Sequence, residues 1–145
     1  MKVRVINGPN LNLLGTREPE IYGHDTLLDV EQQCRQAGAQ LGYEVECLQS
    51  NHEGQLVEWI QQAIGSVDVI VINAAAYTHT SVAIHDALRA FSGYTVELHI
   101  SNPHQREAFR HRSFVAPAAN AIVAGLGVAA YADVIKLLPQ LPVAT

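Results

Sequence analysis

Short apolar runs alternate along this chain with longer segments in which apolar residues recur at helical spacing. Runs of consecutive or alternating apolar residues are typical of strands. They predict strands at 3–6, 44–48, 67–72 and 95–100, with a last short strand at 121–123. Helical spacing predicts helices at 27–41, 53–64, 81–91 and 128–138.

The order of these elements indicates the fold class. Strands that alternate with helices form a parallel sheet with helices on both faces. The run at 67–72 is almost continuously apolar, as in a central strand, whereas 44–48 alternates with polar residues, as in a strand near an edge. We therefore expect one catalytic α/β domain over residues 1–145, with a flavodoxin-like, five-stranded parallel sheet.

Composition narrows the class of protein. Apolar residues make up 48% of the 145 residues, which argues for a substantial core and against disorder. The net charge is −5, from 9 basic and 14 acidic side chains, and there is no basic run. We therefore expect neither nucleic acid nor a membrane surface as partner. No apolar stretch reaches the roughly 18 residues that span a bilayer.

The two cysteines carry little functional signal. Cys34 lies in a helical pattern and Cys47 in a strand pattern, without metal-type spacing, so both are expected to pack in the core. The chain opens directly on a strand, without the pattern of a signal peptide. A reducing, cytoplasmic location is therefore expected.

The segment 7–23 follows the first strand and is rich in Asn, Gly and Pro, so we expect it to lack regular structure. It combines leucines that can anchor it with polar side chains, among them Arg17 and Tyr22. A long loop in a compact domain is usually either functional or disordered. Because it leaves the carboxyl end of a strand, this loop lies where open α/β sheets keep their active sites.

Polar side chains recur where the other predicted strands end. Parallel strands bring these ends together, so a single crevice is expected to collect them. The side chains concerned are Asn10, Arg17, Tyr22, Asn73, His79, His99, Ser101 and Arg110. Such a crevice is neutral to basic on an acidic protein, which indicates a small polar anion as ligand and Arg as its carboxylate binder.

Glu97 and His99 stand out because they alternate within an otherwise apolar strand and so point to the same face. Burying a charged pair costs free energy. An acid beside a histidine orients the imidazole, which suits a proton donor. We therefore expect this pair to be functional.

Several single residues have an equally good structural explanation. Tyr22 could be a half-buried loop tyrosine, Asn73 could cap the next turn, and His79 could tie a loop. Arg106 and Glu107 could form an ordinary solvated ion pair.

Two other kinds of site fit less well. Seven histidines raise the question of a metal, but they are scattered over separate loops and no His-Glu-x-x-His is present, so no metal is expected. Residues 125–130 match a dinucleotide-binding pattern, but they follow the last strand and the chain ends where the ribose-binding acid should come. We interpret these glycines as close backbone packing. A flavodoxin-like module that binds a small ligand or nucleotide remains the alternative function.

The motifs also resemble a known family. Residues 7–15 read Asn-Gly-Pro-Asn-Leu-Asn-Leu-Leu-Gly, followed by Arg-Glu-Pro at 17–19 and Tyr-Gly at 22–23. Further blocks lie at 49–54, 73–83, 97–102 and 106–110. In this order, over nearly the whole chain, they are similar to type II 3-dehydroquinate dehydratase. Ala130 and Ala74 stand where the family often has Gly and Pro, without loss of a functional group.

The resemblance implies a cofactor-free removal of water from 3-dehydroquinate, giving 3-dehydroshikimate in the shikimate pathway or in quinate breakdown. It implies Tyr22 as the base, and Arg17 as the cation that a tyrosine needs because it otherwise ionises near pH 10. It also implies that Asn10 stabilises the enolate and that His99, oriented by Glu97, protonates the departing hydroxyl.

Substrate binding is implied in the same way. The residues concerned are Asn73, His79, Arg106 and Arg110, the backbone amides of Ile100 and Ser101, and Asp86 from a neighbouring subunit. The family assembles as a homododecamer, a tetramer of trimers, and the segment 15–22 would act as a lid. A lysine-based mechanism is not expected, because Lys2 and Lys136 lie outside the predicted crevice.

Overall fold

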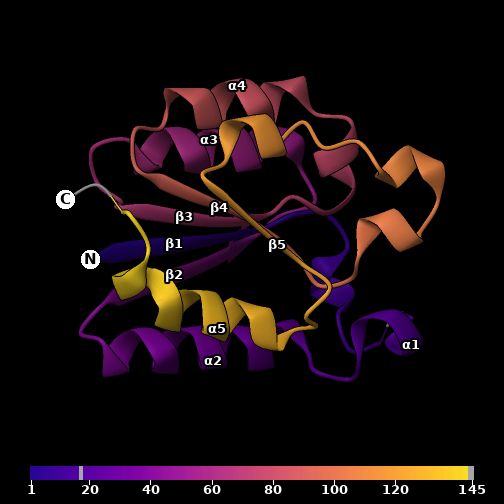
Figure 1. The fold of residues 1–145 in the computed structure, drawn as a ribbon, viewed down its shortest axis with the longest axis horizontal. Helices are drawn as coiled ribbons and strands as arrows, with labels where there is room; N and C mark the ends of the chain where they lie inside the picture. The colour runs from indigo at the N-terminus through magenta and orange to yellow at the C-terminus, as the bar shows by residue number, and fades with distance from the viewer. Residues whose placement is uncertain (17, 144–145) are drawn as a thin grey trace.

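The structure is a computed structural model that describes residues 1–16 and 18–143. Its centre is a parallel sheet of five strands in the order β2-β1-β3-β4-β5 (Figure 1). The strands are β1 (Lys2–Asn7), β2 (Glu44–Gln49), β3 (Val69–Asn73), β4 (Tyr94–His99) and β5 (Ala121–Ala124). This order is that of the flavodoxin-like fold, so the predicted fold class is confirmed. β2 lies at an edge and β3 at the centre, as their hydrophobic patterns predicted.

Helices cover both faces of the sheet (Figure 1). They are α2 (Leu27–Gln40) and α5 (Ala129–Leu137) on one face, and α3 (Glu53–Ala63) and α4 (Val82–Ala90) on the other, whereas the short α1 (Pro19–Tyr22) lies beyond the end of the sheet. The pairs α2 with α5 and α3 with α4 each pack side by side. None of the helices in residues 1–16 and 18–143 is long and apolar enough to cross a bilayer.

The central strands build two apolar cores, one on each face. In β3, Val69 and Val71 pack into the core under α2 and α5, whereas Ile70 and Ile72 pack into the core under α3 and α4. All four are fully buried, and each contributes about 1.5–3 kcal/mol. This two-sided burial is why 67–72 is almost continuously apolar. Cys34 and Cys47 pack into the first core as free thiols, as predicted.

Local chemistry sets the element ends, which differ from the predicted ends by at most two residues. Thr26 caps α2, because its hydroxyl accepts from the Asp29 amide at 3.2 Å while the Asp29 carboxylate accepts from the Thr26 amide at 3.0 Å.

The prediction that 7–23 lacks regular structure is wrong in two places. Leu11–Leu13 forms a 3₁₀ turn, and Pro19 starts the single-turn helix α1 because its fixed φ suits the first helical position.

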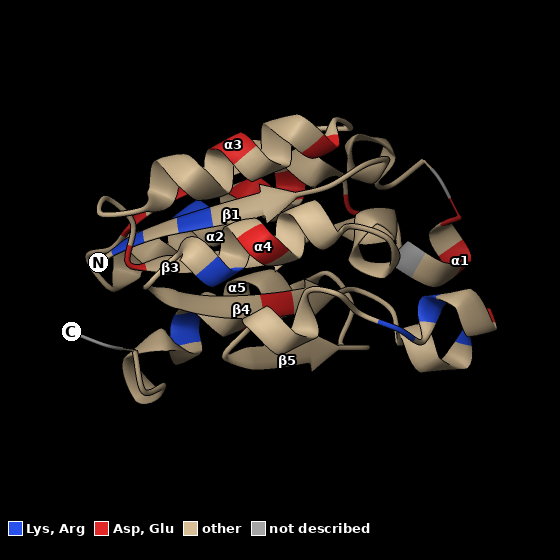
Figure 2. Cartoon of the chain, turned by 90° about the horizontal axis from the view of Figure 1, so that it is seen from above, with Lys and Arg blue, Asp and Glu red and all other residues tan. Residues whose placement is uncertain are grey.

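The strand register aligns polar residues at one end of the sheet. Asn7 pairs with Asn73 between β1 and β3, Ile72 with Glu97 between β3 and β4, and His99 with Ala124 between β4 and β5. Figure 2 shows basic residues in the segment after β4, at the end of the molecule where α1 lies. The carboxyl ends of β1, β3 and β4 therefore meet a positively charged segment.

Candidate active site

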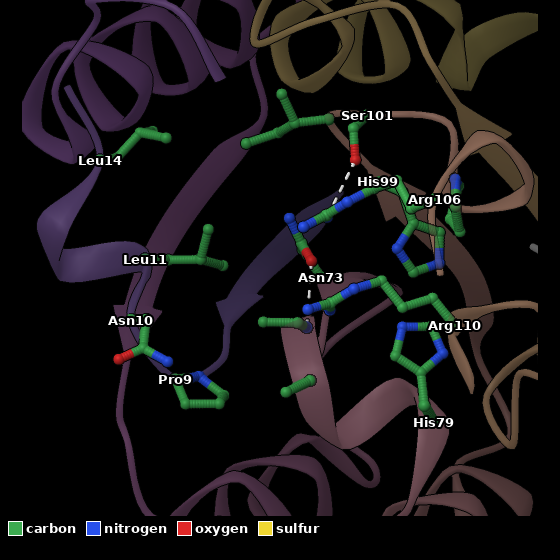
Figure 3. A pocket seen from close by; sticks show the side chains of 14 residues that line it. Pro9, Asn10, Leu11, Leu14, Asn73, His79, His99, Ser101, Arg106 and Arg110 are labelled. Carbon is green, nitrogen blue, oxygen red and sulfur yellow. Dashed lines mark hydrogen bonds between the residues drawn. The ribbon is translucent and has the colours of Figure 1, made fainter. Parts of the chain in front are cut away.

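A cavity of about 190 Å³ opens at the carboxyl ends of β1, β3 and β4 (Figure 3). Among the described residues, its lining contains no acidic side chain but two histidines and two arginines. Eight of the predicted site residues line it, namely Asn10, Asn73, His79, His99, Ile100, Ser101, Arg106 and Arg110. The predicted polar crevice is thus present, with the positive character that suits an anion.

The other four predicted site residues are Arg17, Tyr22, Asp86 and Glu97. Arg17 and the side chain of Tyr22 lie outside the described part of the structure, although Tyr22 itself ends α1. Asp86 is exposed on α4 and does not line the cavity of this single chain. Glu97 is buried in β4 behind His99.

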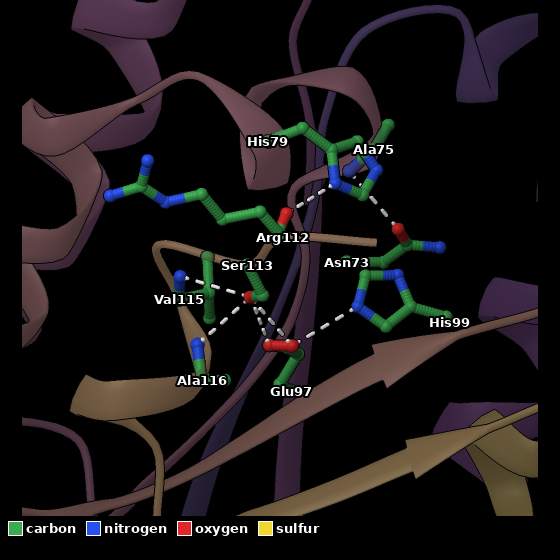
Figure 4. Close-up of polar contacts among 9 residues, drawn as sticks. All are labelled: Asn73, Ala75, His79, Glu97, His99, Arg112, Ser113, Val115 and Ala116. Atoms are coloured by element: carbon green, nitrogen blue, oxygen red, sulfur yellow. Dashed lines mark hydrogen bonds and ion pairs between the residues drawn. The ribbon is translucent and has the colours of Figure 1, made fainter. Parts of the chain in front are cut away.

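Glu97 and His99 point to the same face of β4, as their spacing predicted. His99 Nε2 lies 3.1 Å from Glu97 Oε2, with only 11% and 3% of the two side chains exposed (Figure 4). A carboxylate in this position fixes the orientation and the tautomer of the ring. His99 therefore faces the cavity as a held imidazole rather than as a freely rotating one.

Ser113, which no sequence pattern had pointed to, contacts Glu97 on the side away from His99 (Figure 4). The Ser113 hydroxyl donates to Glu97, with Oγ 2.7 Å from Oε1 and 3.0 Å from Oε2. The same Oγ accepts from the backbone amides of Val115 at 3.1 Å and Ala116 at 3.0 Å. A serine sixteen residues after Glu97 carries no periodic signal, so only the fold reveals this contact.

His79 ties two loops together and also lines the cavity. Its Nδ1 lies 2.8 Å from the Arg112 carbonyl oxygen, which identifies Nδ1 as the protonated nitrogen and leaves Nε2 as an acceptor. Burial lowers the pKa of His79, while the Arg112 carbonyl acts in the opposite direction. The His79 and His99 rings stack with centroids 6.5 Å apart and an interplanar angle of 17°. Both the loop-tying role and the cavity-lining role of His79 are therefore present.

Asn73 likewise combines capping with a place in the lining. Its Oδ1 accepts from the Ala75 amide at 3.1 Å, and its Nδ2 donates to the Tyr131 hydroxyl at 2.9 Å. Tyr131 in turn donates to Asn7 Oδ1 at 2.7 Å. Burial raises the pKa of Tyr131, so this hydroxyl stays protonated and donates. Ala75 adopts a left-handed φ of 52°, a strained conformation typical of functional turns.

Close backbone contacts fix the loop that carries Asn10. A Cβ at Gly8 would lie 2.4 Å from the Ala74 carbonyl oxygen, so only glycine fits there. The backbone amide of Asn10 donates to Asn51 Oδ1 at 3.0 Å, and the Gln49 side chain donates through Nε2 to the Gly8 carbonyl oxygen at 3.2 Å. The loops after β1, β2 and β3 are thereby held to one another.

The basic segment after β4 contributes two arginines. Arg106 Nη1 donates to Ser101 Oγ at 3.4 Å, which places its guanidinium beside the end of β4. Glu107 forms an ion pair with Arg110 at 2.6 Å, across one turn of the segment. An ion pair of Glu107 was thus expected, but with a different arginine.

The glycines at 125 and 127 do not form a nucleotide-binding loop. They adopt left-handed φ values of 84° and 75° in the turn between β5 and α5. Their amides donate to the carbonyls of His99 and Ile100, at 3.3 and 3.0 Å. The glycines are therefore explained by this turn, rather than by the close packing that the sequence suggested, and the turn steadies the end of β4. Across residues 1–16 and 18–143, no three His, Cys, Asp or Glu side chains are grouped to hold a metal ion.

Comparison with known proteins identifies the family. The model of the family described as Dehydroquinase class II matches residues 1–138. The "3-dehydroquinate dehydratase 2" of Ralstonia nicotianae is 57% identical over 94% of this chain and 92% of its own length. The "3-dehydroquinate dehydratase" of Variovorax paradoxus is 56% identical over 94% of this chain and 97% of its own.

Solved structures agree with this assignment. The type II dehydroquinase from Butyrivibrio crossotus superimposes with a TM-score of 0.93 at 45% identity, covering 96% of this chain and 97% of that one. The type II dehydroquinase from Propionibacterium acnes superimposes with a TM-score of 0.92 at 40% identity, covering 97% of each chain. Matches of this extent in sequence and in fold show that the chain belongs to the class II dehydroquinase family.

Proposed function

We propose that this chain is a 3-dehydroquinate dehydratase, a hydro-lyase that eliminates water from 3-dehydroquinate to give 3-dehydroshikimate. The observation that carries the proposal is the Glu97–His99 pair, held at 3.1 Å beside a cavity whose described lining residues include two arginines and no acid. This pair supplies a proton donor, and the arginines supply an anion site. The family and the named relatives support the same activity. They do not favour a flavodoxin-like ligand-binding module.

The reaction divides into two proton transfers. Tyr22, as phenolate beside the Arg17 guanidinium, takes a proton from the carbon next to the ketone, and the electrons of that bond form an enolate. Asn10 stabilises the enolate oxygen through hydrogen bonds. The enolate then expels the hydroxyl group, which His99 protonates so that it leaves as water. No step requires a cofactor.

The proposed binding groups match the cation-rich lining. The backbone amides of Ile100 and Ser101, with Arg106 close to Ser101, suit the carboxylate of the substrate. The side chains of Asn73, His79 and Arg110 suit its hydroxyl groups. The segment 15–22 closes over the bound substrate and excludes water.

We also propose that the site is completed by a neighbouring subunit in a homododecamer, a tetramer of trimers. Asp86 is exposed and away from the cavity of its own chain, so it can serve the cavity of a neighbour. Large apolar side chains are exposed on this chain, including Phe109, Ile122 and Leu126 at 58–67%. Association would remove them from water. The assembly, the cytoplasmic location and the role in the shikimate pathway remain predictions.

The test is a direct assay of dehydration. The purified protein is mixed with 3-dehydroquinate, and the ultraviolet absorbance of the conjugated enone product is followed. We expect the absorbance to grow with the wild-type protein, both with and without excess chelator. With His99→Gln, the rate of this growth should be lower by at least ~10²-fold. Absence of dehydration by the wild-type protein, or unimpaired dehydration by His99→Gln, would refute the proposal. Flavin absorbance in the purified protein would support the binding-module alternative.

A further inference from the structure

Neighbouring groups use both lone pairs and the hydrogen of the Ser113 hydroxyl. A serine oxygen has two lone pairs and one hydrogen. The backbone amides of Val115 and Ala116 occupy both lone pairs, at 3.1 and 3.0 Å. The one hydrogen must therefore point to Glu97, whose two oxygens lie 2.7 and 3.0 Å away. The direction of this hydrogen bond is set by the backbone and cannot reverse.

This direction makes Glu97 the acceptor of the Ser113 hydrogen. Both carboxylate oxygens lie within hydrogen-bond distance of the Ser113 hydroxyl, and 2.7 Å is a short, well-formed contact. Glu97 is 2% exposed, so these contacts replace water around its charge. An imidazole is more basic than a carboxylate, so the proton between Glu97 and His99 resides on the ring.

The acceptor role of Glu97 determines which nitrogen of the His99 ring carries a hydrogen. Because Glu97 accepts, the nitrogen that faces it at 3.1 Å, Nε2, must carry a hydrogen. The neutral ring then has its lone pair on Nδ1, which is the nitrogen left to exchange a proton with a ligand. His79 stacks on this ring, and its own Nδ1 is committed to the Arg112 carbonyl, so it offers no competing donor to Glu97.

We propose that Ser113 is a positioning residue that fixes the neutral His99 ring as the Nε2–H tautomer, so that Nδ1 is the nitrogen that takes up a proton and then, from the imidazolium, delivers it to the leaving hydroxyl. The role of His99 as proton donor rests on the proposed function, whereas the tautomer does not. Ser113 is not among the residues that line the cavity, and its side chain reaches His99 through Glu97. The backbone amides at 115–116 thus donate to Ser113, and Ser113 and the His99 ring both donate to Glu97.

The tautomer is measured by nitrogen NMR on protein with ¹⁵N-labelled histidine, without substrate, at a pH where the ring is neutral. The His99 signals are assigned by their loss in His99→Gln. We expect the wild-type protein and Ser113→Thr, which keeps the hydroxyl, to show Nε2–H. In Ser113→Ala the preference for this tautomer should weaken, and kcat should fall about 10-fold to 100-fold with KM little changed.

Two further variants keep the test decisive. In Glu97→Gln, the Ser113 hydrogen takes the amide oxygen and turns the amide NH₂ toward His99, so the ring should switch to the Nδ1–H tautomer. Ser81→Ala is the matched control, because Ser81 Oγ also accepts a backbone amide, that of Ile84 at 2.9 Å, but forms no hydrogen bond to Glu97 in the described part of the chain. It should leave the tautomer and kcat unchanged.

The outcomes separate the two claims. If Ser113→Ala keeps both the Nε2–H tautomer and the wild-type kcat, the positioning role is wrong. If Ser113→Ala does not fold, retention of Nε2–H in Glu97→Gln overturns the proposal instead. If the wild-type protein does not dehydrate 3-dehydroquinate, the proposed function fails, yet the tautomer measurements still decide the role of Ser113.

Discussion

Tyr131→Phe is the perturbation whose size follows most directly from the structure. The Tyr131 hydroxyl is buried and forms two hydrogen bonds, from Asn73 Nδ2 at 2.9 Å and to Asn7 Oδ1 at 2.7 Å. Removing it leaves two buried amide groups each one partner short. Asn7 suffers more, because its Nδ2 is already buried without a partner among the described residues.

An unsatisfied buried group costs about 1–3 kcal/mol. We therefore expect the free energy of unfolding to fall by about 2–4 kcal/mol, which is the cost of two such groups minus the small gain from burying a Phe ring. For a chain of this length, that lowers Tm by about 4–16 °C. Asn73 also loses one of its two anchors, so we expect KM for 3-dehydroquinate to rise, because its amide is then free to turn in the cavity.

The assay is thermal unfolding and steady-state kinetics at one fixed protein concentration, since oligomers unfold in a concentration-dependent way. Tyr94→Phe is the control. Tyr94 is 7% exposed and packs in the same core, but its hydroxyl forms no hydrogen bond within the described part of the chain. We expect its Tm to change by less than half as much. Equal effects of the two variants would refute the reasoning that the hydrogen bonds, and not the hydroxyl volume, stabilise this region.

Three other predictions concern the site. Tyr22→Phe and Arg17→Ala should each lower turnover by at least ~10²-fold, and the double variant should be scarcely worse, because both disable one proton abstraction; fully multiplicative losses would assign Arg17 another role. Gly8→Ala should cost about 1–3 kcal/mol in unfolding free energy because its Cβ meets the Ala74 carbonyl at 2.4 Å, whereas Gly54→Ala, with nothing within 4 Å, should be neutral or stabilising. Burial lowers the pKa of His79 below its usual 6.5, so the unfolded chain binds that proton first as the pH falls, and the fold loses stability below about pH 6.5. His79→Gln should reduce this acid-side loss in urea titrations, and an unchanged pH dependence would contradict the assignment.

The sequence predicts the fold well because the fold follows from short-range patterns. The almost continuous apolar run around Val71 marks a strand buried on both faces, and the alternation of Glu97 and His99 places both on one face. The short helix Pro19–Tyr22 was missed because a single turn is too short for any periodicity to show.

What the sequence does not predict are contacts between distant segments. Ser113 meets Glu97 across sixteen residues, and Tyr131 meets Asn73 and Asn7 across 58 and 124. No local pattern distinguishes these two hydroxyls from those of other serines and tyrosines. Their positions depend on how helices and loops pack on the sheet, so only the three-dimensional arrangement reveals them.

The division of labour between Tyr22 and His99 is the central claim, and hydrogen exchange tests it most directly. 3-Dehydroquinate is incubated with enzyme in ²H₂O, and mass spectrometry measures deuterium in the recovered substrate and the amount of 3-dehydroshikimate formed. His99→Gln should exchange the hydrogen next to the ketone while forming little product, because Tyr22 still makes the enolate but no acid protonates the hydroxyl. Tyr22→Phe should do neither. Product formation by His99→Gln at the wild-type rate, or exchange by Tyr22→Phe at the rate of His99→Gln, would contradict the account.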